Sequence, residues 1–310
     1  MSNDKLTISA FQLFQMFPDE AAARKYLEGR RWPSGVCCPT CGSVERITTR
    51  GGKREGFYRC GSGCGEFTVR TGTIFERSHL SLRQWVIAMY LLVTARKGIS
   101  SLQLSKELGC TQRTAWFALH RLREACGGEL AKLAGIVEVD ETYVGGKNRN
   151  KHARKQLKAG RGAVGKAAVL GLRQRGGEVR ALHVQATDAD TVHQAIHRHV
   201  EVGSELHTDE AATYSGIGGL FFGHDTINHG IGEYVRGNVT TNGIESVFAV
   251  MKRGIIGVYH HTSSKHLNRY AQEFAFRLNE GNCERHTLDR LDSLIRAAQG
   301  KRLTFKELTK

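Results

Sequence analysis

The stretch from Ile136 to Val144, IVEVDETYV, has the two-residue period of a β-strand and places Asp140 among apolar residues. Further segments of this part of the chain alternate between the periods of strands and helices. In chain order they are strands at 167–173 and 178–185, a helix at 189–200, a strand at 205–208, and helices at 242–254 and 264–279. Three strands followed by alternating helix and strand predict a mixed α/β domain.

Three carboxylates occupy positions in this domain that are unusual for a plain core. Asp140 lies in an apolar strand and Asp209 at the end of another, and an unpaired carboxylate beside buried apolar residues is costly unless a divalent cation offsets the cost. Glu245 and Lys252, seven residues apart, lie on the same flank of the 242–254 helix. Together they predict a site for paired magnesium ions that activate a water or a 3′-hydroxyl beside a phosphodiester, with Lys252 holding a phosphate.

Each of these acidic residues also has a purely structural interpretation. Asp140 could be a salt-bridged strand residue and Asp209 a turn or cap residue. Glu245 could close a capping box with Asn242, since Asn-x-x-Glu has that spacing. Few structural requirements would generate all of these residues together, which favours the functional interpretation.

Two cysteine pairs precede this domain, Cys38 with Cys41 and Cys60 with Cys64, separated by 18 intervening residues. Each pair lies on a short turn containing glycine or proline, so the four thiolates suit tetrahedral zinc, whose binding energy replaces a missing apolar core. The second pair has three intervening residues where two are usual, and Cys37 could compete as a ligand. The alternative is that the four cysteines are small core residues.

The segment 101–123 predicts two short helices around a turn at Gly109, with Thr111 capping the second helix. In a helix-turn-helix this arrangement places Gln112, Arg113 and His120 on the outer face, where side chains reach base edges in the major groove. An ordinary helical hairpin that packs on its neighbour has the same apolar pattern.

The chain of 310 residues carries 45 Lys and Arg against 30 Asp and Glu, a formal charge of +15, which favours a nucleic-acid partner. The loop 147–166 contributes eight of these basic residues and no acidic one. They are Lys147, Arg149, Lys151, Arg154, Lys155, Lys158, Arg161 and Lys166. Its position beside Asp140 favours a clamp on the DNA backbone, and the alternative is a solvated loop.

Neither a transmembrane segment nor a secretory signal is expected, since no run of 18 apolar residues occurs and the N-terminus MSNDKLTISA lacks the layout of a leader. We therefore expect a cytoplasmic, reducing compartment, in which the eight cysteines are metal ligands or buried thiols and not disulfides.

Several motifs together resemble prokaryotic insertion-sequence transposases of the ISXO type, over nearly the whole chain. They include CPTC (38–41), FTVRTGTIF (67–75), VDETYVGGK (139–147), HTDE (207–210), TTNGIES (240–246), KRGIIGVYHH (252–261) and EFAFRLN (273–279). The resemblance implies an α+β/α/β multidomain chain with a zinc ribbon, a helix-turn-helix and an RNase H-like core. The expected parts are a helical lead-in (1–35), the ribbon (36–78), the helix-turn-helix region (79–133), the catalytic domain (134–282) and a C-terminal tail (283–310).

By the same resemblance, the activity is metal-dependent polynucleotidyl transfer, in which hydrolysis at the ends of the element frees 3′-hydroxyls that attack target DNA. Asp140, Asp209 and Glu245 would bind magnesium or manganese, and Lys252 would be the associated lysine. The implied partners are double-stranded DNA, as terminal inverted repeats and as target, and a second copy of the chain in a nucleoid-associated complex. The alternatives are a DNA-binding regulator without catalysis and a nuclease without strand transfer.

Neutralising Lys151, Arg154 and Lys155 together is expected to weaken DNA binding across all sequences, because the loop is predicted to contact phosphates. The slope of the logarithm of the binding constant against the logarithm of salt concentration should become shallower by roughly 2 to 3. Binding measured between about 50 and 200 mM salt checks this. An unchanged slope would show that the loop is a solvated segment.

Overall fold

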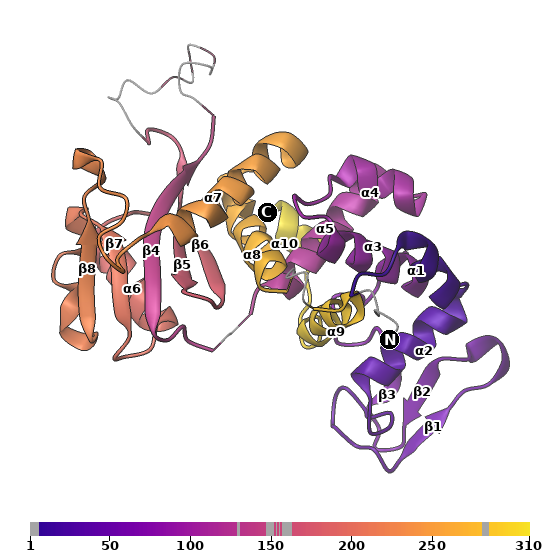
Figure 1. Ribbon diagram of the computed structural model, residues 1–310. Coiled ribbons are helices and arrows are strands. Elements are labelled where there is room, and N and C mark those ends of the chain that lie inside the picture. The colour runs from indigo at the N-terminus through magenta and orange to yellow at the C-terminus, as the bar shows by residue number, and fades with distance from the viewer. Residues whose placement is uncertain are drawn as a thin grey trace, which may run out of the picture. The chain divides into compact units, whose positions relative to one another are not determined.

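The computed structural model describes residues 6–128, 131–146, 152, 154, 156, 163–280 and 285–310. The chain forms two compact units (Figure 1), Met1–Gly128 with Glu280–Lys310 and Glu129–Asn279. Among the described helices, none is both long and apolar enough to cross a membrane.

The first unit contains a small antiparallel sheet with strand order β1-β2-β3 and a set of helices. Its elements are α1 (Ala10–Met16), α2 (Glu20–Arg31), β1 (Ile47–Thr49), β2 (Phe57–Cys60), β3 (Gly65–Thr68), α3 (Leu82–Thr94), α4 (Ser101–Leu108), α5 (Gln112–Cys126), α9 (Thr287–Ala297) and α10 (Phe305–Thr309). The rings of Trp32, Tyr58 and Phe67 contact one another with centroids 5.5 to 6.0 Å apart, and they form the apolar centre beside the sheet. So small a core needs further stabilisation.

Helix α3 lies at the centre of the helical part. Ser81 caps it through a capping box with Gln84, and Trp85 and Met89 are fully buried. Helix α9 packs against α2, α3 and α5. The C-terminal segment is therefore part of this unit and not a separate tail, because Leu291 and Leu294 bury its apolar face.

The second unit is built on a five-stranded sheet of order β6-β5-β4-β7-β8. Its elements are β4 (Ile136–Val144), β5 (Ala167–Gln174), β6 (Val179–Val184), α6 (Ala189–His199), β7 (Glu205–Asp209), β8 (Gly223–Ile227), α7 (Asn242–Gly254), a π-helix (Ile255–Tyr259) and α8 (Ser264–Glu280). Strands β4, β5 and β6 pair antiparallel, whereas β7 runs parallel to both β4 and β8. The mixed α/β domain is confirmed, and β8 is the strand that the sequence does not predict.

Two apolar clusters cover the two faces of this sheet. Val137 and Val139 of β4 pack in the cluster that contains α6, while α7 and α8 form the other cluster with Val169 of β5. Because successive strand residues point to opposite faces, Glu138 and Asp140 lie on the face that α7 covers. The alternation of β4 thus directs two carboxylates toward one helix.

The close approach of α7 to the sheet depends on Gly171 of β5, which pairs with Asp140. A Cβ at this position would lie 2.6 Å from Ile244 Cδ1 and 2.6 Å from Phe248 Cζ. Both of these side chains are buried, so they have little room to move. Gly171 therefore sets how near α7 lies to β4 and β5.

The variant Gly171→Ala should destabilise the chain by about 1–3 kcal/mol, because the added methyl group overpacks the contact between α7 and the sheet. Urea denaturation of the full chain measures the loss. Gly223→Ala in β8 is the matched control, since its Cβ would meet only ordinary contacts. Equal stability of the two variants would contradict this account.

Candidate functional site

The first candidate site is the cysteine cluster of the first unit. The Sγ atoms of Cys38, Cys41, Cys60 and Cys64 all lie within 4.8 Å of one another, and those of Cys41 and Cys60 are 3.6 Å apart. Cys60 ends β2 and Cys64 immediately precedes β3, so the wider second turn is a hairpin connection. Cys37 is not part of the cluster.

The electrostatics of the four thiols fit a cation between them. Burial alone would raise the pKa of the Cys38 thiol. Hydrogen bonds from the backbone of Cys41 and Thr40 outweigh this effect and lower the pKa to about 6. Hydrogen bonds with Cys41, followed by burial, raise the pKa of Cys64 to about 12, and the negative charge of Cys38 adds to the rise. Four sulfur ligands in this arrangement are the donor set of a structural zinc ion.

The second candidate site combines Asp140 and Asp209 in the second unit. Strands β4 and β7 are parallel neighbours, with Glu138 paired to His207. Asp140 and Asp209 each lie two residues beyond this pair, so both project from the same face near the same end of adjacent strands. The sheet thus brings together two carboxylates that are 69 positions apart in the sequence.

Glu245 joins them from the first turn of α7. Its Oε1 accepts a hydrogen bond from Thr241 Oγ1 at 3.3 Å and lies 3.4 Å from His229 Nε2. Thr241 is the residue that precedes the helix and Asn242 is its first residue. The capping box of Asn242 with Glu245 is therefore absent, which removes the structural alternative for Glu245.

Asp140 lies in a buried and negatively charged environment. Burial, together with the negative charges of Glu141, Asp209 and Glu245, raises the pKa of Asp140 to about 7. Burial also raises the pKa of Glu141, and burial and the charge of Glu141 raise that of Tyr214. The charged groups that influence Asp140 most are thus acidic, which does not support a salt-bridged Asp140.

The three carboxylates do not form the ligand shell of a single ion. Within the described ranges, a second group besides the cysteines brings three ligand atoms within 4.8 Å, namely Glu205, His207 and Asp225. Arg175 and the Thr240 amide, which can only donate, both face His207 Nδ1, at 3.1 and 3.5 Å. Nε2 therefore carries the hydrogen and donates it to Glu205 at 2.7 Å, which makes His207 unsuitable as a ligand.

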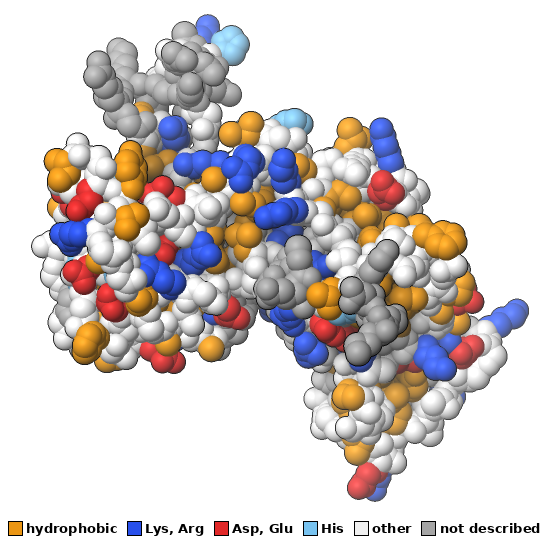
Figure 2. All heavy atoms as spheres, in the orientation of Figure 1, with side chains coloured by type: hydrophobic (Ala, Val, Ile, Leu, Met, Phe, Trp, Pro, Cys, Tyr) orange, Lys and Arg blue, Asp and Glu red, His pale blue; other side chains and the backbone are white. Residues whose placement is uncertain are grey.

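Lys252 lies in the last turn of α7 with its side chain exposed. It is about 10 Å from Glu245 along the helix axis, at 1.5 Å per residue. Arg253 follows it, and Figure 2 shows basic side chains along the surface that α7 occupies. This position suits contact with a polyanion beside the carboxylates.

Helices α4 and α5 of the first unit are connected by Gly109 in the left-handed conformation, with Thr111 capping α5. Gln112 and Arg113 are exposed as predicted, although Gln112 donates a hydrogen bond to Ser101 and the Arg113 guanidinium covers the Phe305 ring. The prediction for His120 was wrong. It is fully buried, with its ring 4.6 Å from that of Trp116, because residues 118–123 of α5 are all buried and this part of the helix has no exposed face.

The basic loop is mostly outside the described residues. Arg154 is exposed and Lys166 is half-buried immediately before β5. The remaining predicted DNA contacts of the loop lie outside the described part of the chain: Lys147, Arg149, Lys151, Lys155, Lys158 and Arg161.

Each of the two units contains a region that matches a known protein family. Residues 18–66 match the transposase zinc-ribbon domain, and residues 132–279 match the ISXO2-like transposase domain. A protein of Halobacterium salinarum, described as an uncharacterized protein in transposable element ISH50, is 30% identical over 273 residues. The alignment covers 84% of this chain and 91% of that protein. The chain belongs to the ISXO2-like transposase family.

In this member of the ISXO2-like transposases, the sequence did not single out four polar residues near the carboxylates. They are Glu138, Arg175, His207 and His229. Glu138 and His207 are recognisable as the same-face neighbours of Asp140 and Asp209 once the strands are known. Arg175 and His229 lie in connecting segments, and their contacts follow no local period.

Without added divalent cations, Asp140→Asn should raise the stability of this transposase-family chain by on the order of 4 kcal/mol at pH 8, but by only about 1.5 kcal/mol at pH 5. The folded chain holds a proton on Asp140 at pH 5 that the unfolded chain has largely lost. The raised pKa therefore lowers stability as the pH rises from about 4 to 7.

Urea denaturation at the two pH values measures this difference. The control is Asp190→Asn, which replaces an exposed carboxylate on α6. A stability gain of Asp140→Asn that does not depend on pH would show that its pKa is not raised.

Proposed function

We propose that this chain is a metal-dependent DNA transposase that hydrolyses phosphodiester bonds at the ends of an insertion sequence and joins the freed 3′-hydroxyls to target DNA. The observation that carries the proposal is the placement of Asp140 and Asp209 on the same face of neighbouring strands β4 and β7, with Glu245 in the first turn of α7, the helix that covers this face. Carboxylate oxygens gathered at one end of a sheet are the ligands that hard divalent cations such as Mg²⁺ prefer.

The fold supports an RNase H-like interpretation of the second unit. Three antiparallel strands come first, and two parallel strands then extend the sheet on the other side of β4. This arrangement puts the carboxylates of β4 and β7 on adjacent strands.

Hydrogen bonding within the described part of the chain favours cation binding at each carboxylate. Asp140 Oδ1 accepts from the Glu141 amide at 2.7 Å, and Asp209 Oδ1 accepts from the Ala211 amide at 3.1 Å. Oε1 of Glu245 is held by Thr241. These contacts orient each side chain and leave its other oxygen for a cation.

Asp140, Asp209 and Glu245 would hold a pair of magnesium or manganese ions, whose ligands can be spread more widely than those of one ion. When bound, the ions activate the attacking oxygen and stabilise the leaving oxygen of the phosphodiester. Asp140 would lose its proton on binding, so we expect binding to strengthen as the pH rises toward 8.

The remaining site residues would hold DNA. Lys252 would contact a phosphate about two helical turns from Glu245, and the basic loop would contact the backbone more widely. The zinc ribbon and the α4–α5 pair, through Gln112 and Arg113, would recognise the terminal inverted repeats. Because two ends must be joined together, the active complex would contain at least two copies of the chain.

The variant Asp140→Asn should abolish end cleavage and strand transfer, a loss of at least about 1,000-fold, while it leaves binding of end DNA within about twofold. Cleavage of a labelled DNA end with magnesium or manganese and a gel-shift assay measure the two effects. Glu178→Gln, an exposed carboxylate beside β6, is the control and should cleave normally.

Undiminished cleavage by Asp140→Asn would refute the assignment of the triad. Binding of end DNA by the wild-type chain without cleavage in either metal would instead favour a DNA-binding regulator.

A further inference from the structure

We propose that Glu138 is a positioning residue that caps α7 from the neighbouring strand and thereby holds Glu245 at the carboxylate site. The inference rests on the proposed function, in which Glu245 binds a cation. It assigns a role to a buried charge that the carboxylate triad itself does not use.

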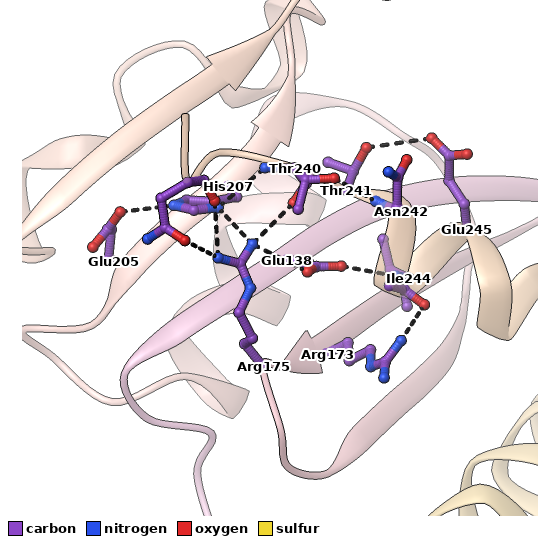
Figure 3. Close-up of polar contacts among 12 residues, drawn as sticks. Glu138, Arg173, Arg175, Glu205, His207, Thr240, Thr241, Asn242, Ile244 and Glu245 are labelled. Carbon is purple, nitrogen blue, oxygen red and sulfur yellow. Dashed lines mark hydrogen bonds and ion pairs between the residues drawn. The ribbon is translucent and has the colours of Figure 1, made fainter. Parts of the chain in front are cut away.

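At the N-terminus of α7 the Thr240 hydroxyl accepts the Asn242 amide hydrogen at 3.2 Å, but no described side chain close in the sequence accepts that of Ile244. Thr241 precedes the helix, but its side chain makes no capping hydrogen bond. The Thr241 hydroxyl instead donates to Glu245. The cap comes from β4, where Glu138 Oε2 accepts the Ile244 amide hydrogen at 2.9 Å (Figure 3). Because Glu138 accepts the Ile244 amide, the Thr241 hydroxyl is not needed as a cap and can orient Glu245.

Glu138 is only 3% exposed, so its charge needs compensation. Arg175 supplies it, with Nη2 lying 3.3 Å from Glu138 Oε1. The same guanidinium donates to His207 Nδ1 and to the carbonyls of Asn238 and Thr240 (Figure 3). Arg175 therefore connects β4 and β7 to the segment that leads into α7, and the positive end of the helix dipole adds to the stabilisation.

Gly243 makes this cap possible. A Cβ at position 243 would collide with the Glu138 carboxylate and with the Arg173 guanidinium, which donates to the Gly243 carbonyl at 2.6 Å. The glycine of the motif TTNGIES is thus required by the close approach of the helix to Glu138 and not by its backbone conformation.

The residues that hold the start of α7 and the two aspartates lie on the same two strands, β4 and β7. Glu138 lies two residues before Asp140, and its strand partner His207 lies two residues before Asp209. The contacts of Glu138 with Ile244 and of His207 with Thr240 therefore fix the position of the first turn of α7 relative to the two aspartates. Loss of the cap would release the first turn of α7, which contains Glu245, without removing any metal-binding oxygen.

Binding of Mn²⁺ alone to the zinc-loaded full chain tests the proposal, measured by electron paramagnetic resonance. Four proteins are compared: wild type, Glu138→Ala, Glu245→Ala and the double variant. We expect Glu138→Ala to raise the Mn²⁺ dissociation constant about tenfold, as residues that orient metal ligands do. If Glu138 acts through Glu245, the double variant should bind Mn²⁺ as Glu245→Ala does, whereas general destabilisation would add the two effects.

Two further variants separate positioning from stability. Glu138→Gln keeps an oxygen for the Ile244 amide and should raise the dissociation constant by no more than about threefold. Asp188→Ala removes the cap of α6, a helix of the same unit, and should leave Mn²⁺ binding unchanged. Hydrogen exchange at the Ile244 amide should accelerate in Glu138→Ala and not in Asp188→Ala.

Additive effects in the double variant, or unchanged Ile244 exchange in Glu138→Ala, would overturn the role of Glu138. Failure of the proposed function looks different, because Glu245→Ala would then bind Mn²⁺ as tightly as wild type. The two failures are thus distinguished by the single Glu245 variant.

Discussion

The contact of α7 with the middle of the five-stranded sheet is the constraint on which the candidate active site depends. Two glycines permit it: Gly171 leaves room for the apolar stripe of the helix, and Gly243 leaves room for the carboxylate of Glu138. The apolar contact sets the distance of the helix from the sheet, and the Glu138 hydrogen bond sets where the helix begins. Glu245 is placed by both.

The same contact gathers negative charge in a partly buried place. Burial, with added repulsion from neighbouring carboxylates, raises the pKa of Asp140 to about 7, so this site weakens the fold at neutral pH when no cation is present. Arg175 compensates Glu138 but does not neutralise Asp140. The two carboxylates therefore have different roles. The charge of Glu138 is compensated within the protein, whereas that of Asp140 is left for a positively charged ligand.

The small sheet of the first unit has little apolar core of its own, since three aromatic rings form its centre beside the cysteine cluster. Zinc at the four thiols would supply the stabilisation that this core lacks. Helix α9 returns to the same unit and packs against α2, α3 and α5. The sheet unit is therefore inserted into the chain of the first unit, and the described residues 6–128 and 285–310 belong to one folded body.

The sequence by itself determined the features that depend on neighbouring residues. The strand period of β4, the Thr111 cap and the cysteine spacing are local, so they were predictable. Only the tertiary structure decided that His120 is buried, that the C-terminal helices join the first unit and that Glu138 caps α7. Glu138 and Ile244 are 106 residues apart, and no local propensity encodes which buried carboxylate meets which helix end; packing of the whole sheet decides it.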